Sequence, residues 1–217
     1  MSTPAPAKGK PERVVLDGRY ARLEPIGVQH VAGLYRAAST GDAAQRFVYL
    51  FDHAPNTEGD IVAYVAKAAA TDDPLMFAVV DKSTGRAEGR QTLMRITPEH
   101  GVVEIGNIYW GPAIARSRVA TEALYLHAAY IFDELGYRRF EWKCNNLNEP
   151  SKAAALRFGF AFEGMFRQHM IVKGQSRDTA WFAMLDGDWP RLKAEYQRWL
   201  DPSNFDAAGG QKTKLRF

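Results

Sequence analysis

The sequence predicts a single domain of the α/β class (α+β), with helices flanking a central, mostly antiparallel sheet of about seven strands. Three observations support this prediction. Apolar stretches separated by turn residues between positions 75 and 110 indicate an antiparallel meander. A helix, a strand, a second helix and a long hairpin then follow. The 217 residues suffice for one domain with a full core, and we find no internal repeat or second boundary.

The N-terminal third is expected to form a hairpin and two helices. Residues 14–25 contain an Asp-Gly pair between two short apolar stretches, which is a strong hairpin signal. Residues 28–38 and 57–70 have helical spacing, and Thr57 can cap the second of these helices.

The rest of the chain alternates strands and helices. Strands are expected over 75–80, 87–97, 102–110, 138–143, 162–172 and 177–185. Further helices are expected over 119–135, after Asn148, and over 188–200. The longest helix has its core stripe on Ala120, Leu124, His127, Ile131 and Leu135.

The domain is expected over residues 13–200. Residues 1–12 lack an apolar signal core and are expected to be a disordered lead-in. Residues 201–217 have no periodicity and are expected to form a C-terminal tail with a solvated basic end.

The composition excludes several classes of protein. A net charge of +3 gives no basic surface typical of nucleic-acid binding, and no apolar run is long enough for a membrane span. The single cysteine, Cys144, rules out an internal disulfide and fits a reducing cytoplasm. The five histidines show no metal-ligand spacing, so no metal is expected, and His127 reads as a satisfied core residue.

Residues 115–121 are a candidate phosphate site. The N-terminus of a helix leaves amides without partners and has a partial positive charge. Arg116 and Arg118 add full charges beside it, a combination that suits phosphate. An ordinary helix start with two surface arginines would explain this loop equally well.

The order of motifs resembles the GCN5-related N-acetyltransferases (GNAT), in particular the branch that acetylates ribosomal protein N-termini (RimJ/RimL-like). The resemblance rests on the strand 102–110, the loop 115–121, Asn148-x-x-Ser151 and Gly159-Phe160, and it covers about residues 17–189. It implies an acetyl-CoA-dependent acyltransferase whose sheet is splayed open between the strands ending at Trp110 and Lys143. In this family the loop amides hold the pyrophosphate of coenzyme A.

The match in that loop is imperfect. Ala115 stands where the family usually has Arg or Gln, and Arg118 stands where it usually has Gly, whereas Ala120 and Thr121 fit the branch. A glycine lets the backbone approach phosphate without a Cβ in the way. The cofactor-binding residues that the resemblance implies are Ile108, Tyr109, Trp110, Ala115, Arg116, Ser117, Arg118, Val119, Ala120, Thr121, Asn145, Asn148 and Ser151.

Amine acetylation needs a base, an oxyanion donor and a proton for the leaving thiolate. Glu104, amid apolar neighbours beside the expected opening, is the candidate base, with a solvent-facing strand residue as the alternative. The resemblance implies that a backbone amide near Tyr109 or Trp110 is the oxyanion donor. Ala155 replaces the tyrosine that many family members use as acid, which makes Ser151 the candidate donor to sulfur or else a plain first-turn residue. Cys144 is expected to be a buried apolar residue and not a nucleophile.

These observations predict an N-acetyltransferase that moves an acetyl group from acetyl-CoA directly to a primary amine. The acceptor is either a protein N-terminus or a small amine. We expect residues 47–56, the helix 57–70 and the turn 172–177 to build its pocket. The alternative is a non-catalytic acyl-CoA-binding module that keeps the fold. A cytoplasmic monomer or homodimer is expected.

Overall fold

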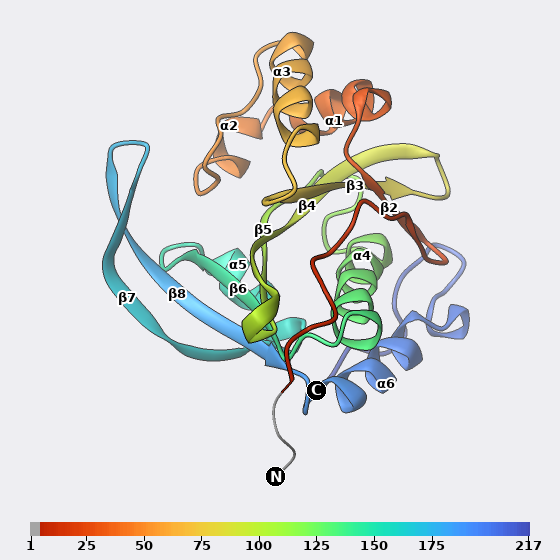
Figure 1. Cartoon of the computed structure of the whole chain (residues 1–217). Helices are drawn as coiled ribbons and strands as arrows, with labels where there is room; N and C mark the ends of the chain where they lie inside the picture. The colour runs from red at the N-terminus through yellow and green to blue at the C-terminus, as the bar shows by residue number, and fades with distance from the viewer. Residues whose placement is uncertain (1–4) are drawn as a thin grey trace.

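One eight-stranded sheet organises the chain in the computed structural model, which describes residues 5–217 (Figure 1). The strand order is β1-β2-β3-β4-β5-β6-β8-β7, and only β5 and β6 are parallel neighbours. The strands are β1 Leu16–Asp17, β2 Ala21–Pro25, β3 Leu75–Asp81, β4 Arg86–Thr97, β5 Val102–Trp110, β6 Arg139–Asn145, β7 Ala161–Val172 and β8 Gln175–Leu185. The predicted fold class is confirmed, with eight strands where about seven were expected.

Helices cover both faces of the sheet. They are α1 Val31–Ala38, α2 Ala43–Arg46, α3 Glu58–Ala69, α4 Arg118–Ala129, α5 Glu149–Arg157 and α6 Trp189–Leu200, with short turns of helix at Val28–His30, Pro98–His100, Tyr130–Glu134 and Pro202–Asn204. In Figure 1, α1, α2 and α3 lie at the top, while α4 and α6 lie on the other side of the sheet. None of the helices within residues 5–217 is long and apolar enough to cross a membrane.

The two faces of the sheet pack against different helices. We call them the α3 face, covered by α1 and α3, and the α4 face, covered by α4, α5 and α6. Strand β3 is a continuous apolar run because it is buried on both sides. Its Phe77 and Val79 join the main core with α4, whereas Met76 and Ala78 pack in the cluster with α1 and α3.

Capping residues set the ends of the helices. Thr57 caps α3, as predicted, by accepting a hydrogen bond from the Asp60 amide, and the two residues form a capping box. Ser117 caps α4 by accepting from the Val119 amide at 3.1 Å. The predicted helix 119–135 ends with a π-helical turn, Tyr130–Glu134, and then stops at Gly136, whose φ of 70° suits glycine.

Glu122 anchors the N-terminal hairpin to α4. Its buried carboxylate accepts hydrogen bonds from the amides of Arg19, Tyr20 and Ala21 at 2.9, 2.5 and 2.6 Å. A carboxylate with three backbone donors is a strong local tie. It fixes the β1–β2 turn over the start of α4.

Strands β5 and β6 separate after a short paired stretch. They pair only from Val102–Arg139 to Ile105–Trp142, and β6 then continues alongside β8 as far as Asn145–Thr179. The edge of β5 beyond Ile105 therefore has no strand partner on the β6 side within the described chain. This opening is the splay that the family resemblance implied.

Both termini differ from the expectation. The amides of Ala7 and Lys8 bond to the carbonyls of Pro98 and Leu135, so residues 7 and 8 are packed on the domain. The C-terminal tail is also packed, because Phe205 is buried. Residues 1–4 of the expected lead-in lie outside the described residues. Periodicity cannot detect such segments, because single contacts and not a repeating face hold them.

Candidate active site

A bulge in β5 marks the point where the sheet opens. The register of β5 against β4 shifts between Gly106 and Tyr109, and Asn107 between them has a φ of 48°. Asparagine tolerates this left-handed conformation better than most residues. In the side chain of Asn107, Nδ2 donates to the Tyr64 hydroxyl at 2.9 Å and Oδ1 accepts from Arg90 Nη2 at 3.3 Å. Two neighbouring elements thus hold the bulge in place.

Arg90 ties this bulge to the loop between α2 and α3. Its guanidinium is only 3% exposed and contacts both carboxylate oxygens of Asp52, at 2.8 and 2.7 Å. The Tyr64 ring lies 4.4 Å from the guanidinium carbon. No motif in the sequence marks Arg90. The one sequence feature that could have pointed to it is a charged residue in the middle of a predicted strand.

The last residues of β5 divide between the two faces. Ile108 and Trp110 pack toward the main core on the α4 face, and Trp110 Nε1 donates to Gln91 Oε1 at 3.3 Å. Tyr109 points to the α3 face, where its hydroxyl donates to the Ala37 carbonyl at 2.7 Å. Because the side chains of these three residues are packed, they present only their backbone to the opening.

The start of α4 keeps free donors. Thr121 is the first residue of the helix whose amide bonds to a carbonyl before it, at 3.2 Å from Ser117 O. The amides of Arg118 and Ala120 have no acceptor among residues 5–217. Arg116, in the preceding turn, is exposed and has a φ of 61°. This arrangement can bind an anion.

The backbone amides of Ala115 and Val119 are bonded within the protein. The Ala115 amide bonds to the Gly111 carbonyl at 2.9 Å, so it is not free for a ligand. The Val119 amide is taken by the Ser117 cap, and its side chain lies in the main core.

Arg118 is stacked between two aromatic rings. Its guanidinium carbon lies 4.5 Å from the Tyr20 ring centre and 5.2 Å from that of Phe205. The side chain thus joins the N-terminal hairpin to the C-terminal segment. A different arginine, Arg157 of α5, reaches the first turn of α4, where its Nη1 donates to Thr121 Oγ1 at 3.2 Å. No sequence pattern indicates this role of Arg157, because α5 and α4 meet only in the folded chain.

The polar residues after β6 hold the local backbone. Asn145, which is the last residue of β6, accepts from the Leu147 amide at 2.9 Å. Asn148 caps α5 by accepting from the Ser151 amide at 3.2 Å. In both asparagines the side-chain oxygen holds the local backbone, which leaves the side-chain nitrogen available to donate to a ligand.

Ser151 lies against the α4 face of β6. Its Oγ accepts from Trp142 Nε1 at 3.0 Å. Burial raises the pKa of the Cys144 thiol, and a hydrogen bond with Ser151 offsets part of that effect. Cys144 is buried, as predicted, and a thiol with a raised pKa is a poor nucleophile.

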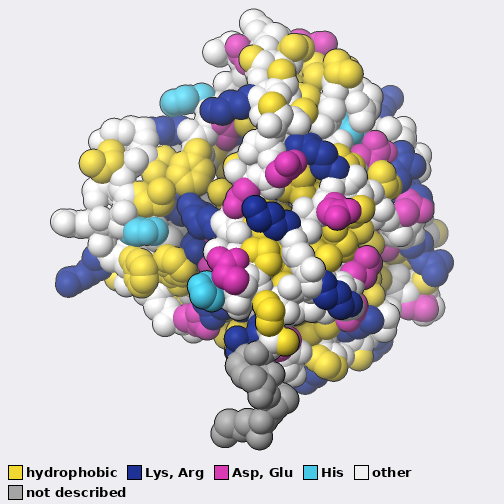
Figure 2. Space-filling model, viewed as in Figure 1, with side chains coloured by type: hydrophobic (Ala, Val, Ile, Leu, Met, Phe, Trp, Pro, Cys, Tyr) yellow, Lys and Arg dark blue, Asp and Glu magenta, His cyan; other side chains and the backbone are white. Residues whose placement is uncertain are grey.

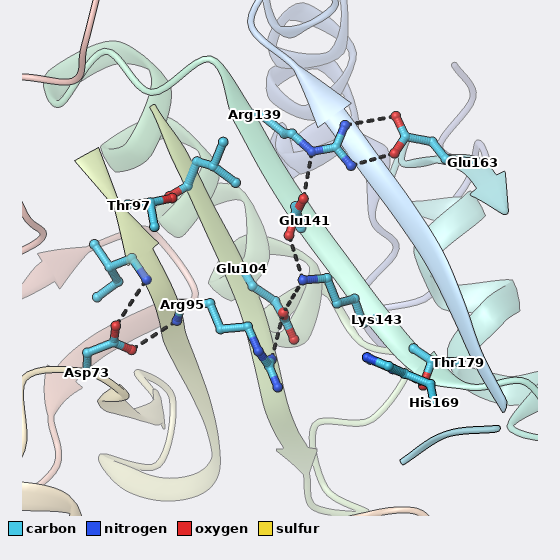
Figure 3. Close-up of polar contacts among 12 residues, drawn as sticks. Asp73, Arg95, Thr97, Glu104, Arg139, Glu141, Lys143, Glu163, His169 and Thr179 are labelled. Atoms are coloured by element: carbon cyan, nitrogen blue, oxygen red, sulfur yellow. Dashed lines mark hydrogen bonds and ion pairs between the residues drawn. The ribbon is translucent and has the colours of Figure 1, made fainter. Parts of the chain in front are cut away.

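Glu104 lies on the opposite, α3 face of the sheet, and it is 3% exposed. Its Oε2 pairs with Arg95 Nη1 at 2.7 Å and with Lys143 Nζ at 2.9 Å (Figure 3). The expected apolar surroundings are wrong, and so is the solvent-facing alternative. The residues next to Glu104 in the chain are apolar, but alternation sends them to the other face.

Glu104 belongs to a chain of ion pairs across β4, β5, β6 and β7. Lys143 also contacts Glu141 Oε2 at 2.7 Å, and Arg139 contacts Glu141 Oε1 at 2.7 Å and Glu163 beyond it. Figure 3 shows these side chains lying in a row over the sheet. We call them the ion-pair row. It leaves the α3 face polar directly beside the opening.

The segments expected to build an acceptor pocket lie together. Residues 52–56 and α3 line a hollow of about 250 Å³ that includes Tyr64. The tip of the β7–β8 hairpin contacts the beginning of the 47–56 segment, where Lys173 Nζ donates to the Phe47 carbonyl at 2.8 Å. On this side of the molecule, hydrophobic, basic and histidine side chains gather over the β7–β8 arm (Figure 2).

His127 is a core residue, but it is only half satisfied. Its Nδ1 lies 2.9 Å from Gln91 Nε2, and its Nε2 has no partner among residues 5–217. Burial lowers the pKa of His127 to about 3, so the ring is neutral at physiological pH. In the described part of the chain, no group of three His, Cys, Asp or Glu side chains could hold a metal ion.

Comparisons with known proteins all indicate the same family. The chain matches the acetyltransferase (GNAT) domain family over residues 21–161. The crystal structure of a GCN5-related N-acetyltransferase from Brucella melitensis is 57% identical, with a TM-score of 0.94 over 97% of this chain and 96% of that one. The uncharacterised N-acetyltransferase p20 from Bacillus licheniformis is 28% identical over 117 residues, and the match spans 52% of this chain and 63% of that protein.

One neighbour bears on the predicted branch. RimL, named as a ribosomal α-N-protein acetyltransferase, is 18% identical, with a TM-score of 0.69 over 79% of this chain and 94% of that one. Identity at this level shows the shared fold alone, so the RimJ/RimL-like branch stays a prediction. The domain match and the Brucella structure together show that this chain belongs to the GNAT acetyltransferase family.

Proposed function

We propose that this protein transfers an acetyl group from acetyl-CoA to a primary amine. Acetyl transfer in general follows from the family, whereas the cofactor and the type of acceptor are our proposals. The observation that supports them best is the opening between β5 and β6 beside the donor-rich start of α4.

The residues around this opening fit coenzyme A. The free amides of Arg118 and Ala120, with the charges of Arg116 and Arg157, suit its phosphates. The open edge of β5 and the amide nitrogens of the asparagines at 145 and 148 suit the peptide-like groups of its arm. When bound, acetyl-CoA supplies a thioester with an electrophilic carbonyl carbon.

The groups proposed for proton transfer lie on opposite faces of the sheet. Glu104, on the α3 face, is proposed to accept a proton from the acceptor ammonium through water. Ser151, on the α4 face, is proposed to hold a proton at Oγ near the sulfur, oriented by Trp142. A β5 backbone amide near Tyr109 or Trp110 is proposed to stabilise the oxyanion.

Calorimetric titration with acetyl-CoA tests the proposal, with ATP and NADP titrated in parallel. Micromolar binding of acetyl-CoA alone supports the cofactor and justifies a screen of amines by thiol release. Absence of acetyl-CoA binding rejects the enzymatic proposal.

A non-catalytic acyl-CoA-binding module is the second candidate. It is favoured by Arg118, which is engaged by two rings and replaces the family glycine, and by Ala115 and Ala155. Binding of acetyl-CoA without thiol release from any amine would support this module. Amine-dependent thiol release would exclude it.

A further inference from the structure

The charges of the ion-pair row on the α3 face beside the opening balance one another. The ion-pair row joins three cations to three carboxylates in alternation, namely Arg95, Lys143 and Arg139 with Glu104, Glu141 and Glu163. Arg177 of β8 lies on the same face and is outside this row.

Arg177 is a buried cation without a counter-charge. It is 6% exposed, and no carboxylate of residues 5–217 lies within ion-pair distance of it. Its Nε donates to Thr179 Oγ1 at 3.2 Å, while Nη1 and Nη2 have no partner in the same residues and are not sealed from a ligand. Arg90, the other buried arginine of the described chain, is neutralised by Asp52. A buried charge is costly unless it is paired.

Arg177 lies where an acceptor would enter. Asn145, the last residue of β6, pairs with Thr179, so Arg177 extends the α3 face two residues beyond the end of β6. Its guanidinium carbon lies 5.4 Å from the ring of Phe51, in the loop between α2 and α3. The hairpin and that loop thus meet around the guanidinium. The start of α4 lies on the other face, so the phosphates of the cofactor are not its partner.

We propose that Arg177 binds a carboxylate of the acceptor, so that the acceptor is a free amino acid and not a peptide N-terminus. The inference rests on the proposed function, because it names the class of amine that the site would take. The two free Nη atoms can form a bidentate pair with a carboxylate, which a peptide amide at the same place cannot form. The neighbouring Phe51 ring favours an apolar amino-acid side chain.

Matched pairs of ligands test this directly. The 217-residue chain, with and without saturating coenzyme A, is titrated calorimetrically with L-phenylalanine, L-methionine and L-glutamine and with the α-amide of each. The amides keep the amine and the side chain and imitate a peptide N-terminus. We expect at least one carboxylate to bind tenfold or more tightly than its amide.

Variants assign the preference to the guanidinium. Arg177→Gln is expected to reduce the ratio between carboxylate and amide to below twofold. Arg177→Lys keeps the charge without the planar fork and is expected to keep part of the ratio. Arg167→Gln removes the same charge from an exposed position on the same hairpin and is expected to leave the ratio unchanged. If Arg177→Gln does not fold, the wild-type pairs and Arg177→Lys still decide.

Equal or tighter binding of the amides, or no binding by any of these amino acids, would overturn the inference. That result together with acetyl-CoA binding leaves the proposed acetyltransferase intact with a different acceptor. A carboxylate preference that depends on Arg177, without acetyl-CoA binding, would instead retain the carboxylate site and reject the proposed function.

Discussion

Arg118 offers a sharp test of how the start of α4 is used. The family position favours glycine, and a sequence reading makes Arg118 a phosphate ligand. In the structure its guanidinium lies against Tyr20 and Phe205 instead. A half-buried cation–π contact contributes about 0.5–1 kcal/mol, so two contacts contribute about 1–2 kcal/mol. For a chain of this length that corresponds to a shift of about 2–8 °C in the unfolding midpoint.

The experiment compares Arg118→Gln with Arg116→Gln. Arg118→Gln is expected to lower the thermal midpoint as above and to change acetyl-CoA affinity less than about threefold. Arg116 is exposed and beside the free amides, so Arg116→Gln is expected to leave the midpoint unchanged. Its acetyl-CoA affinity is expected to fall about tenfold, the scale of a lost charge-assisted hydrogen bond. Thermal unfolding and calorimetry of both variants measure these effects.

The reverse pattern would refute this reasoning. If Arg118→Gln weakens acetyl-CoA binding tenfold and leaves the midpoint unchanged, Arg118 leaves the two rings to bind phosphate. The contact with Phe205 would then be unimportant for holding the C-terminal segment.

Three further predictions concern Glu122, His127 and Glu104. Glu122→Gln removes the negative charge from three backbone hydrogen bonds, so urea unfolding should show a loss of about 2–4 kcal/mol; a loss below about 0.5 kcal/mol would contradict the anchoring role. The pKa of His127 is about 3 in the folded protein, against an ordinary value of 6.5. Below pH 6.5 the unfolded chain therefore binds more protons than the folded protein, and the free energy of unfolding decreases as the pH is lowered. The loss between pH 6.5 and 5 should be about 1.5 kcal/mol, and His127→Gln should abolish this contribution, whereas His100→Gln at an exposed site should not. Glu104→Gln should slow amine-dependent thiol release at least about tenfold and alter its pH profile, with acetyl-CoA affinity retained; an unchanged profile would place the base elsewhere.

The sequence determined the elements because their signals are local. Helical spacing, the Thr57 and Asn148 caps and the Asp-Gly turn each involve residues a few positions apart. The same locality made the donor-rich start of α4 visible, since an anion site at a helix end needs only the helix. Family resemblance added the opening between β5 and β6, which no local pattern specifies.

Tertiary structure alone decided what Glu104, Arg118 and Arg177 contact. Glu104 is separated from Lys143 by 39 positions and Arg118 from Phe205 by 87, so nothing in the neighbouring residues indicates either contact. The ion-pair row and the unpaired Arg177 on the α3 face, and the stacked Arg118 at the start of α4, all arise where segments distant in sequence meet in the folded chain. Electrostatic environment depends on distances in space and on burial, and the chain sets both only when it folds.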